Sequence, residues 1–258
     1  MTIPSSAGEA RNAVTFIGHS TTLIELEGTR VLTDPLLCKR VVFLLRQVAA
    51  VEMDSLTGID AVVLSHLHRD HCHLRSLRRL PPTTPMFVPV GAARVLRKAG
   101  FSQVTELAVG ERQVVGSVTI EAVEALHSGF RPPFGPHADS LGFLVSAEQS
   151  VYFAGDTALF PEMEALKGRV DLALLPVWGW GPNLRGHHMD PADAAQALYL
   201  IQPRMAIPVH WGTYAPIGFG ALKPRYLHEP PRTFMSLATA QNPAVVVRLL
   251  QPGATLNW

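Results

Sequence analysis

The sequence predicts an α/β protein that forms a four-layer αββα sandwich, with two similar halves in one domain. Three observations lead to this prediction. Short β-rich runs recur along the chain, helical stretches separate them in both halves, and no linker or low-complexity tract divides the halves. Strand-rich halves of this kind bury their apolar faces against each other and carry helices outside. We expect a single domain over 1–258, with halves at approximately 13–125 and 126–258.

The first half is expected to begin with antiparallel strands and to continue with strands that alternate with short helices. The predicted strands cover 13–17, 22–26, 30–33, 59–64, 86–90, 104–109, 114–115 and 118–123. Helices are predicted over 74–80, before Pro81-Pro82, and over 92–98, before Gly100. The apolar segment 41–51 favours a packed cap helix, with a lipophilic lid or flap as the alternative.

The second half has the same style. Its predicted strands cover 141–146, 151–154, 172–177, 205–209 and a closing strand over 244–250. One helix start is well marked, because Asp190 can cap the helix, Pro191 suits its first position and Asp193 places an acid in its first turn. This helix should end before Pro203, and a last helix is predicted over 231–240.

Composition limits the possible functions. The chain has 258 residues, 47% of them hydrophobic, which suffices for a large core. Its 22 basic and 21 acidic residues nearly balance, so we expect no nucleic acid partner. Two cysteines form no disulfide framework, the first twelve residues lack a signal-peptide pattern, and no window is apolar enough to span a bilayer. We expect a cytoplasmic protein without stable membrane insertion; a homo-oligomer remains open.

The predicted buried strand 59–64 runs directly into a dense cluster of polar residues: His66, His68, Asp70 and His71. Imidazole and carboxylate are common ligands of zinc and other transition metals. His66 and His68 face the same way if the strand end is extended, whereas Asp70 and His71 follow a bend and can reach a second ion. A single histidine at a strand end is usually only a hydrogen-bonded polar residue; four ligand-type residues within six positions predict a metal site.

Five further β-runs end in a polar or metal-binding residue. These residues are His19, Asp34, His127, Asp156 and His210. Side chains at one edge of a sheet converge, and loops at strand ends often carry chemistry. Together with the cluster they provide enough donors for two divalent ions. His66, His68 and His127 can serve one ion; Asp70, His71 and His210 can serve the other, with Asp156 as the bridge.

These motifs resemble a known family. The His-x-His-x-Asp-His motif, then His127, Gly155-Asp156-Thr157 and His210, resembles the metallo-β-lactamase superfamily. Within it, the flanking motifs resemble the branch that contains L-ascorbate-6-phosphate lactonase and N-acyl-phosphatidylethanolamine phospholipase D. Those motifs are Gly18-His19-Ser20-Thr21, Thr33-Asp34-Pro35, His188-Met189-Asp190-Pro191 and His210-Trp211-Gly212-Thr213.

The resemblance implies an αββα sandwich, a dinuclear site at one edge of it and the ligand assignment given above. It also implies that His188, rather than the adjacent His187, contacts the substrate or leaving group. His19 and Asp34 resemble residues that orient metal ligands, a role that can be worth 10–100-fold in metal affinity or activity. For Asp34, capping of the turn before Pro35 is the alternative.

The predicted chemistry is hydrolysis by a hydroxide that bridges two divalent ions, zinc first, with manganese or iron as alternatives. The centre should be mildly cationic and favour a small-molecule or lipid-like anionic substrate. A phosphodiester, as for phospholipase D, ranks first because 222–231 resembles that arm of the branch, and a small anionic lactone is the alternative. An iron-dependent oxidoreductase is more remote, since the diiron oxygen reductases typically carry a carboxylate where His68 stands. A non-catalytic metal-binding protein is equally remote.

Other segments have weaker signals. The loop Trp178-Gly179-Trp180-Gly181-Pro182 is expected to wall the pocket. Arg131, Phe134 and Arg185 are expected either to contact substrate or to lie in solvated loops. Cys72 and His73 receive no role, because the donor set is complete without them.

Overall fold

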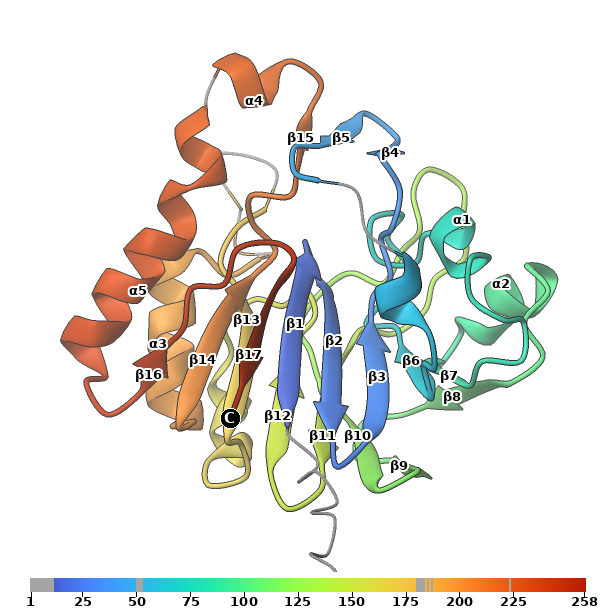
Figure 1. Cartoon of the computed structure of the whole chain (residues 1–258), viewed down its shortest axis with the longest axis horizontal. Coiled ribbons are helices and arrows are strands. Elements are labelled where there is room, and N and C mark those ends of the chain that lie inside the picture. Colours follow the sequence, from blue (N-terminus) through green and yellow to red (C-terminus); the bar gives the residue numbers. More distant parts are fainter. Residues whose placement is uncertain (1–11, 50–52, 180–183, 185, 187, 223) are drawn as a thin grey trace, which may run out of the picture.

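Two seven-stranded sheets pack face to face with helices on their outer sides (Figure 1). The structure is a computed structural model that describes residues 12–49, 53–179, 184, 186, 188–222 and 224–258. Figure 1 shows α1 and α2 beside one sheet and α3 and α5 beside the other. The predicted αββα sandwich is therefore confirmed.

The first sheet has the order β17-β1-β2-β3-β6-β7-β8. Its strands are β1 (Ala13–Gly18), β2 (Thr21–Leu26), β3 (Thr29–Thr33), β6 (Ala61–Val63), β7 (Met86–Pro89), β8 (Val104–Leu107) and β17 (Ala254–Asn257). Strands β17, β1, β2 and β3 pair antiparallel, and β3, β6, β7 and β8 pair parallel. The parallel strands bring their carboxyl ends to one edge.

The second sheet has the order β16-β14-β13-β12-β11-β10-β9. Its strands are β9 (Arg112–Val115), β10 (Val118–Glu124), β11 (Leu141–Ser146), β12 (Ser150–Phe153), β13 (Leu172–Pro176), β14 (Met205–Val209) and β16 (Val246–Val247). Strands β9 to β12 form an antiparallel meander, and β12, β13, β14 and β16 are parallel. Buried strands such as β13 read as continuous apolar runs because both faces are covered.

The helical segments are short apart from two. They are η1 (Met53–Leu56), α1 (Leu74–Leu77), α2 (Ala93–Lys98), η2 (Pro161–Leu166), α3 (Pro191–Ile201), α4 (Phe219–Leu222), η3 (Pro224–Leu227) and α5 (Glu229–Gln241). Helix α3 begins as the sequence predicts, because the Asp190 side chain accepts from the backbone N–H groups of Ala192 and Asp193 in a capping box. None of the described helices is long and apolar enough to cross a membrane.

Alternation along the strands divides the core into two main clusters. Ile24 and Val31 belong to the larger cluster, which fills the space between the sheets and extends under α3 and α5. Their neighbours Leu23 and Leu32 point to the opposite face and pack with residues of α1 and α2. This period of two fixes the strand register, because a shift of one residue would exchange the two faces.

A small third sheet corrects one prediction. Residues 41–49 do not form the expected cap helix; β4 (Arg40–Val41) and β5 (Leu44–Arg46) make a hairpin that pairs with β15 (Tyr214–Pro216). Val41 and Leu44 are buried, whereas Val42 and Phe43 at the turn are 57% and 54% exposed. The spacing of the apolar residues suited a helix. The segment forms a flap instead because β5 pairs with β15, which lies far away in the sequence. Residues 50 and 51 lie outside the described part.

The chain end also differs from expectation. The predicted closing strand over 244–250 shrinks to β16, and the strand that completes the first sheet is β17. Strand β17 is half-exposed and has too few apolar residues for a strand to be predicted from its sequence. It is extended because it pairs with β1. Strands β9 and β10 lie before 125 yet join the second sheet, so each sheet takes strands from both predicted halves.

Candidate metal centre

Strand ends bring the predicted donors to one edge of the sandwich. His19 directly follows β1, Asp34 follows β3, and His210 follows β14. His66 comes after β6 and Asp156 after β12, each within three residues of the strand end. The sequence pattern of strands that end in polar residues therefore translates into one shared site.

His66, His68 and His127 form the first group of donors. One ring nitrogen from each residue lies within 4.8 Å of the others, so the three could hold a metal ion. His127 Nε2 is 3.2 Å from His68 Nδ1. The Nε2 atom of His66 is buried and has no hydrogen-bond partner among the described residues. An uncompensated buried nitrogen is costly, and a cation at this position would satisfy it.

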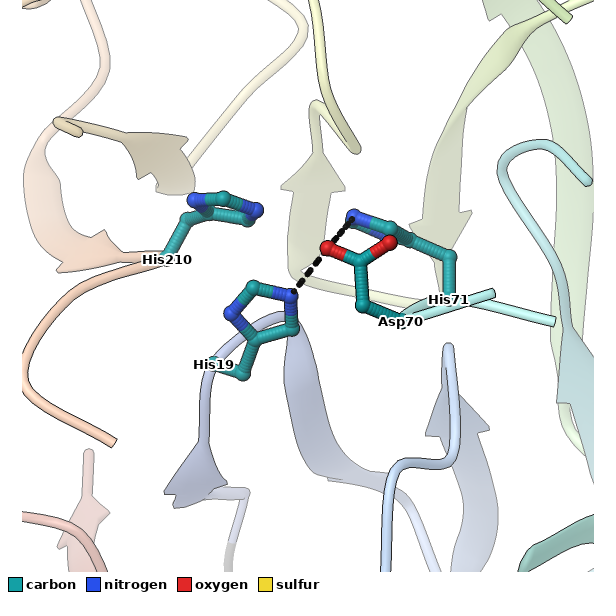
Figure 2. Close-up of side chains that lie close together, drawn as sticks. All are labelled: His19, Asp70, His71 and His210. Atoms are coloured by element: carbon teal, nitrogen blue, oxygen red, sulfur yellow. Dashed lines mark hydrogen bonds and ion pairs between the residues drawn. The ribbon is translucent and has the colours of Figure 1, made fainter. Parts of the chain in front are cut away.

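The second group consists of His19, Asp70, His71 and His210, whose donor atoms also lie within 4.8 Å of one another (Figure 2). Asp70 Oδ2 is 3.1 Å from His19 Nε2 and 3.7 Å from His71 Nε2. The sequence analysis expected His19 to orient ligands from outside. The structure places it beside Asp70 and His210, with its ring centroid 4.0 Å from that of His210, a position that suits either an orienting residue or a ligand.

Asp156 stands between the groups. Its Oδ2 is 3.1 Å from His71 Nε2, and its Oδ1 is 3.3 Å from His210 Nε2. It also forms a possible donor group with His127 and His188. A nearly buried carboxylate that contacts the second group and lies within 4.8 Å of a His127 nitrogen of the first has a position that would suit a bridging ligand.

His188 lies beside this carboxylate, with Nδ1 3.3 Å from Asp156 Oδ2 and its ring 4.8 Å from that of His127. It thus lies next to the candidate ligands, as the sequence analysis expected. His187 lies outside the described residues.

The buried Asp34 carboxylate orients two of the histidines. Its Oδ2 is 2.7 Å from His71 Nδ1, and its Oδ1 accepts from the Ser65 backbone N–H at 2.7 Å. The Ser65 hydroxyl donates to Asp34 Oδ2 and lies 2.9 Å from His66 Nδ1. The carboxylate therefore reaches beyond its own turn, and both rings turn Nε2 toward the site. Sequence reasoning missed Ser65, although its place directly before His66 was a signal.

Backbone geometry shows how closely the site is constrained. His19, Asp34 and His210 have φ angles of 59°, 33° and 61°, in the left-handed region that non-glycine residues seldom adopt. A second constraint fixes His210, because its Nδ1 donates to the Trp178 carbonyl at 2.7 Å. Gly155 precedes Asp156 with φ of 63°, and a Cβ there would lie 2.5 Å from Ser65 Cβ.

Electrostatics favours the ionisation states that a metal requires at His66, Asp70 and Asp156. Burial lowers the pKa of His66 well below its usual value, and the neighbouring His71 adds to this effect. Burial alone would raise the pKa values of Asp70 and Asp156, but nearby histidines hold both well below the usual range. For His71, burial is outweighed by these carboxylates, which raise its pKa well above normal. Ionised carboxylates and a neutral His66 suit a divalent ion.

Several other predicted residues have structural contacts. The nearly buried Arg131 donates through Nη1 to the carbonyl oxygens of Leu67 at 2.5 Å and Cys72 at 3.0 Å, and so ties the metal-motif loop together. Burial raises the pKa of the Cys72 thiol to about 11, and its side chain packs in the cluster under α1 and α2. His73 caps α1 by accepting from the Ser76 N–H. Arg185 and residues 180–182 of the Trp-rich loop lie outside the described part.

A cavity of about 380 Å³ opens onto these donors. Its polar side includes His68, Asp70, Asp156 and His188. Its apolar lining comes mainly from the β4–β5 hairpin and the pair Pro132-Pro133. The site therefore offers charge to one part of a ligand and an apolar wall to another.

Comparison with known proteins decides the family. Residues 29–211 match the family model described as "Beta-lactamase superfamily domain". The chain belongs to the metallo-β-lactamase superfamily of metal-dependent hydrolases. Among relatives in this superfamily, a "metal-dependent hydrolase" of Opitutus terrae is 32% identical, with 95% of this chain and 99% of that protein covered. A second relative is the "N-acyl-phosphatidylethanolamine-hydrolyzing phospholipase D 1" of Caenorhabditis elegans, 31% identical over 79% of this chain. The match spans only 64% of that relative's length.

Solved structures of this superfamily fold agree with the architecture. The metallo hydrolase Igni18 from Ignicoccus hospitalis is 24% identical with a TM-score of 0.69, and covers 96% of this chain and 98% of its own. The diiron β-hydroxylase CmlA from Streptomyces venezuelae has a TM-score of 0.71 at 20% identity, over 96% of this chain and 54% of its own. At such identities the likeness shows the fold alone.

Proposed function

We propose that this superfamily member is a dinuclear phosphodiester hydrolase, with zinc as the first choice of metal. His66, His68 and His127 would hold one ion; Asp70, His71 and His210 would hold the other. The observation that carries the proposal is the position of Asp156, which contacts His71 and His210 on one side and groups with His127 on the other. The orphaned His66 Nε2 supports an ion in the first group.

The residues around the donors have distinct parts in this proposal. Two divalent ions, when bound, acidify water and neutralise charge that develops on substrate oxygens. Asp34 and Ser65 keep Nε2 of His71 and His66 aimed at the site. His19 positions Asp70 through a 3.1 Å contact. His188 stands beside Asp156, where it can contact the leaving group.

The cavity supports a phosphodiester with an apolar substituent. The same cavity is lined by candidate metal ligands and by Val41, Val42 and Phe43 of the hairpin, so a ligand bound at the donors would also meet apolar side chains. A small anionic lactone would leave this apolar wall without a contact. The relative named as a phospholipase D supports a phosphodiester whose apolar substituent is lipid-like.

The test is a panel of phosphodiesters and lactones, assayed with metal-stripped protein and after reconstitution with zinc, manganese or iron. We expect phosphodiester turnover that requires added metal. His68→Ala and Asp156→Ala should each lower kcat/KM at least 100-fold, because each removes a ligand. His137→Ala serves as the control, since His137 is an exposed histidine outside the donor groups. Turnover of lactones alone would replace the proposed substrate class, and turnover that survives chelation and both variants would refute the metal mechanism.

A further inference from the structure

A second cavity shares Val41 and Val42 of the hairpin with the first. It measures about 530 Å³, and its lining includes Arg40, Arg69, Arg75, Arg78 and Arg131. No acidic residue among those described lines it. The whole chain carries a net charge of only +1, so this concentration of positive charge is local.

Four of the five arginines of this pocket donate to backbone carbonyl oxygens, which do not neutralise their charge. Arg40 Nε donates to the Val42 carbonyl at 2.8 Å, and Arg69 Nε donates to the Pro132 carbonyl at 3.2 Å. Arg131 likewise donates to backbone carbonyls. Within the described part of the chain, the arginines that line the pocket form no ion pair with a carboxylate. Arg75 and Arg78 lie three positions apart along α1 and its C-terminal cap, and therefore on the same face of the helix.

The arginine pocket adjoins the cavity at the candidate metal centre. Arg69 lines both cavities, and so do Val41 and Val42 of the hairpin. The residues on either side of Arg69, which are His68 and Asp70, belong to the two donor groups. A ligand with its reacting ester at the donors can therefore extend past Arg69 into the arginine pocket.

We propose that the arginine pocket binds a second anionic group of the substrate, a phosphate or a carboxylate, that is not itself hydrolysed. Guanidinium groups match the planar, bidentate geometry of both anions. The pocket is concave and close to the donors, which suits a group on the same small molecule. This inference rests on the proposed function only for what happens at the metal centre; anion binding by the arginines stands apart from hydrolysis.

The direct test is calorimetric titration of metal-loaded protein with inorganic phosphate. Arg75→Gln/Arg78→Gln should weaken phosphate binding about tenfold, and the loss should shrink at high salt because the charges are exposed. The control is Arg94→Gln/Arg232→Gln, which removes the same charge from exposed helix positions away from either cavity. Binding that is lost in His68→Ala but unchanged in the Arg75/Arg78 variant would place phosphate at the metal centre alone and overturn the proposal.

A kinetic comparison separates this inference from the proposed function. Two chromogenic phosphodiesters are used, identical except that one carries a remote phosphate. The Arg75/Arg78 variant should raise KM about tenfold for the doubly anionic substrate and leave kcat and the other substrate unchanged. An equal effect on both substrates would refute the inference about the pocket and leave the proposed hydrolase function intact. If neither substrate is cleaved, the proposed function fails, and the phosphate titration still decides the pocket.

Anionic lipid vesicles test whether the same charges serve a membrane surface instead. The wild-type chain and the Arg75/Arg78 variant are sedimented with vesicles of phosphatidylcholine and phosphatidylserine. We expect no difference between them. Loss of vesicle binding in the variant, with phosphate binding intact, would overturn the proposal in favour of a membrane contact.

Discussion

Replacing Asp34 by Asn should weaken metal binding while the fold is retained. In the native chain Asp34 Oδ2 accepts from His71 Nδ1–H. The proton is thereby held on Nδ1, and Nε2, which faces Asp156, is the nitrogen that can give up its proton to a metal ion. In Asp34→Asn an amide N–H₂ would take the place of Oδ2 and donate to His71 Nδ1. The ring must then carry its proton on Nε2, and a protonated nitrogen cannot bind a metal.

The magnitude follows from the contacts that change. Loss of such an orienting partner typically costs 10–100-fold in metal affinity, which is about 1.4 to 2.7 kcal/mol. The fold should lose less, about 1 kcal/mol. The amide oxygen can still accept from the Ser65 N–H, and asparagine tolerates the positive φ of this position.

Competition with a chromogenic chelator measures the metal affinity, and thermal unfolding of the stripped protein measures the fold. Asp171→Asn is the matched control, because Asp171 also accepts from a serine N–H and hydroxyl, those of Ser150, away from the site. The reasoning is refuted if Asp34→Asn binds metal as tightly as the wild type. A collapse of the stripped protein would show instead that Asp34 acts on the fold.

Two further predictions concern stability. Gly155→Ala should lower the free energy of unfolding by about 2 to 5 kcal/mol, because its φ is 63° and the new Cβ would lie 2.5 Å from Ser65 Cβ. Urea unfolding measures this loss. Gly168→Ala is the control and should cost much less, because Gly168 has a similar φ of 74° but no atom within 4 Å of the new Cβ. Burial raises the pKa of Glu121, but Arg169 and a second arginine lower it overall. Glu121→Gln should therefore be less stable than wild type at pH 7, and the difference should vanish as acid protonates the carboxyl; a pH-independent difference would contradict this.

Local signals were enough to predict much of the fold. Asp190, Pro191 and Asp193 predicted the start of α3, because caps depend on residues within one turn. Strand β14 was predicted at its observed bounds, since its apolar run is bounded by Pro203 and His210. Segments that depend on distant partners were predicted wrongly or missed. The flap at 41–49 needs β15, and β17 needs β1.

The candidate site shows the same division. The residues of the metal motif and the polar strand ends were visible in the sequence, because each strand end is a local feature. Their mutual distances were not, so the 3.1 Å contact between His19 and Asp70 could not be predicted and Ser65 was overlooked. Contacts of Arg131 with the carbonyls of the motif loop join positions about 60 residues apart and leave no local pattern.

The metal content of the saturated protein tests the central claim most directly. The protein is stripped, reconstituted with excess zinc, passed through a desalting column and analysed by mass spectrometry for zinc per chain. We predict two ions for the wild type and one each for His127→Ala and His210→Ala, which remove donors from different groups. A wild type that saturates at one ion, or a single variant that loses both while the other loses none, would contradict a site with two separate ligand groups.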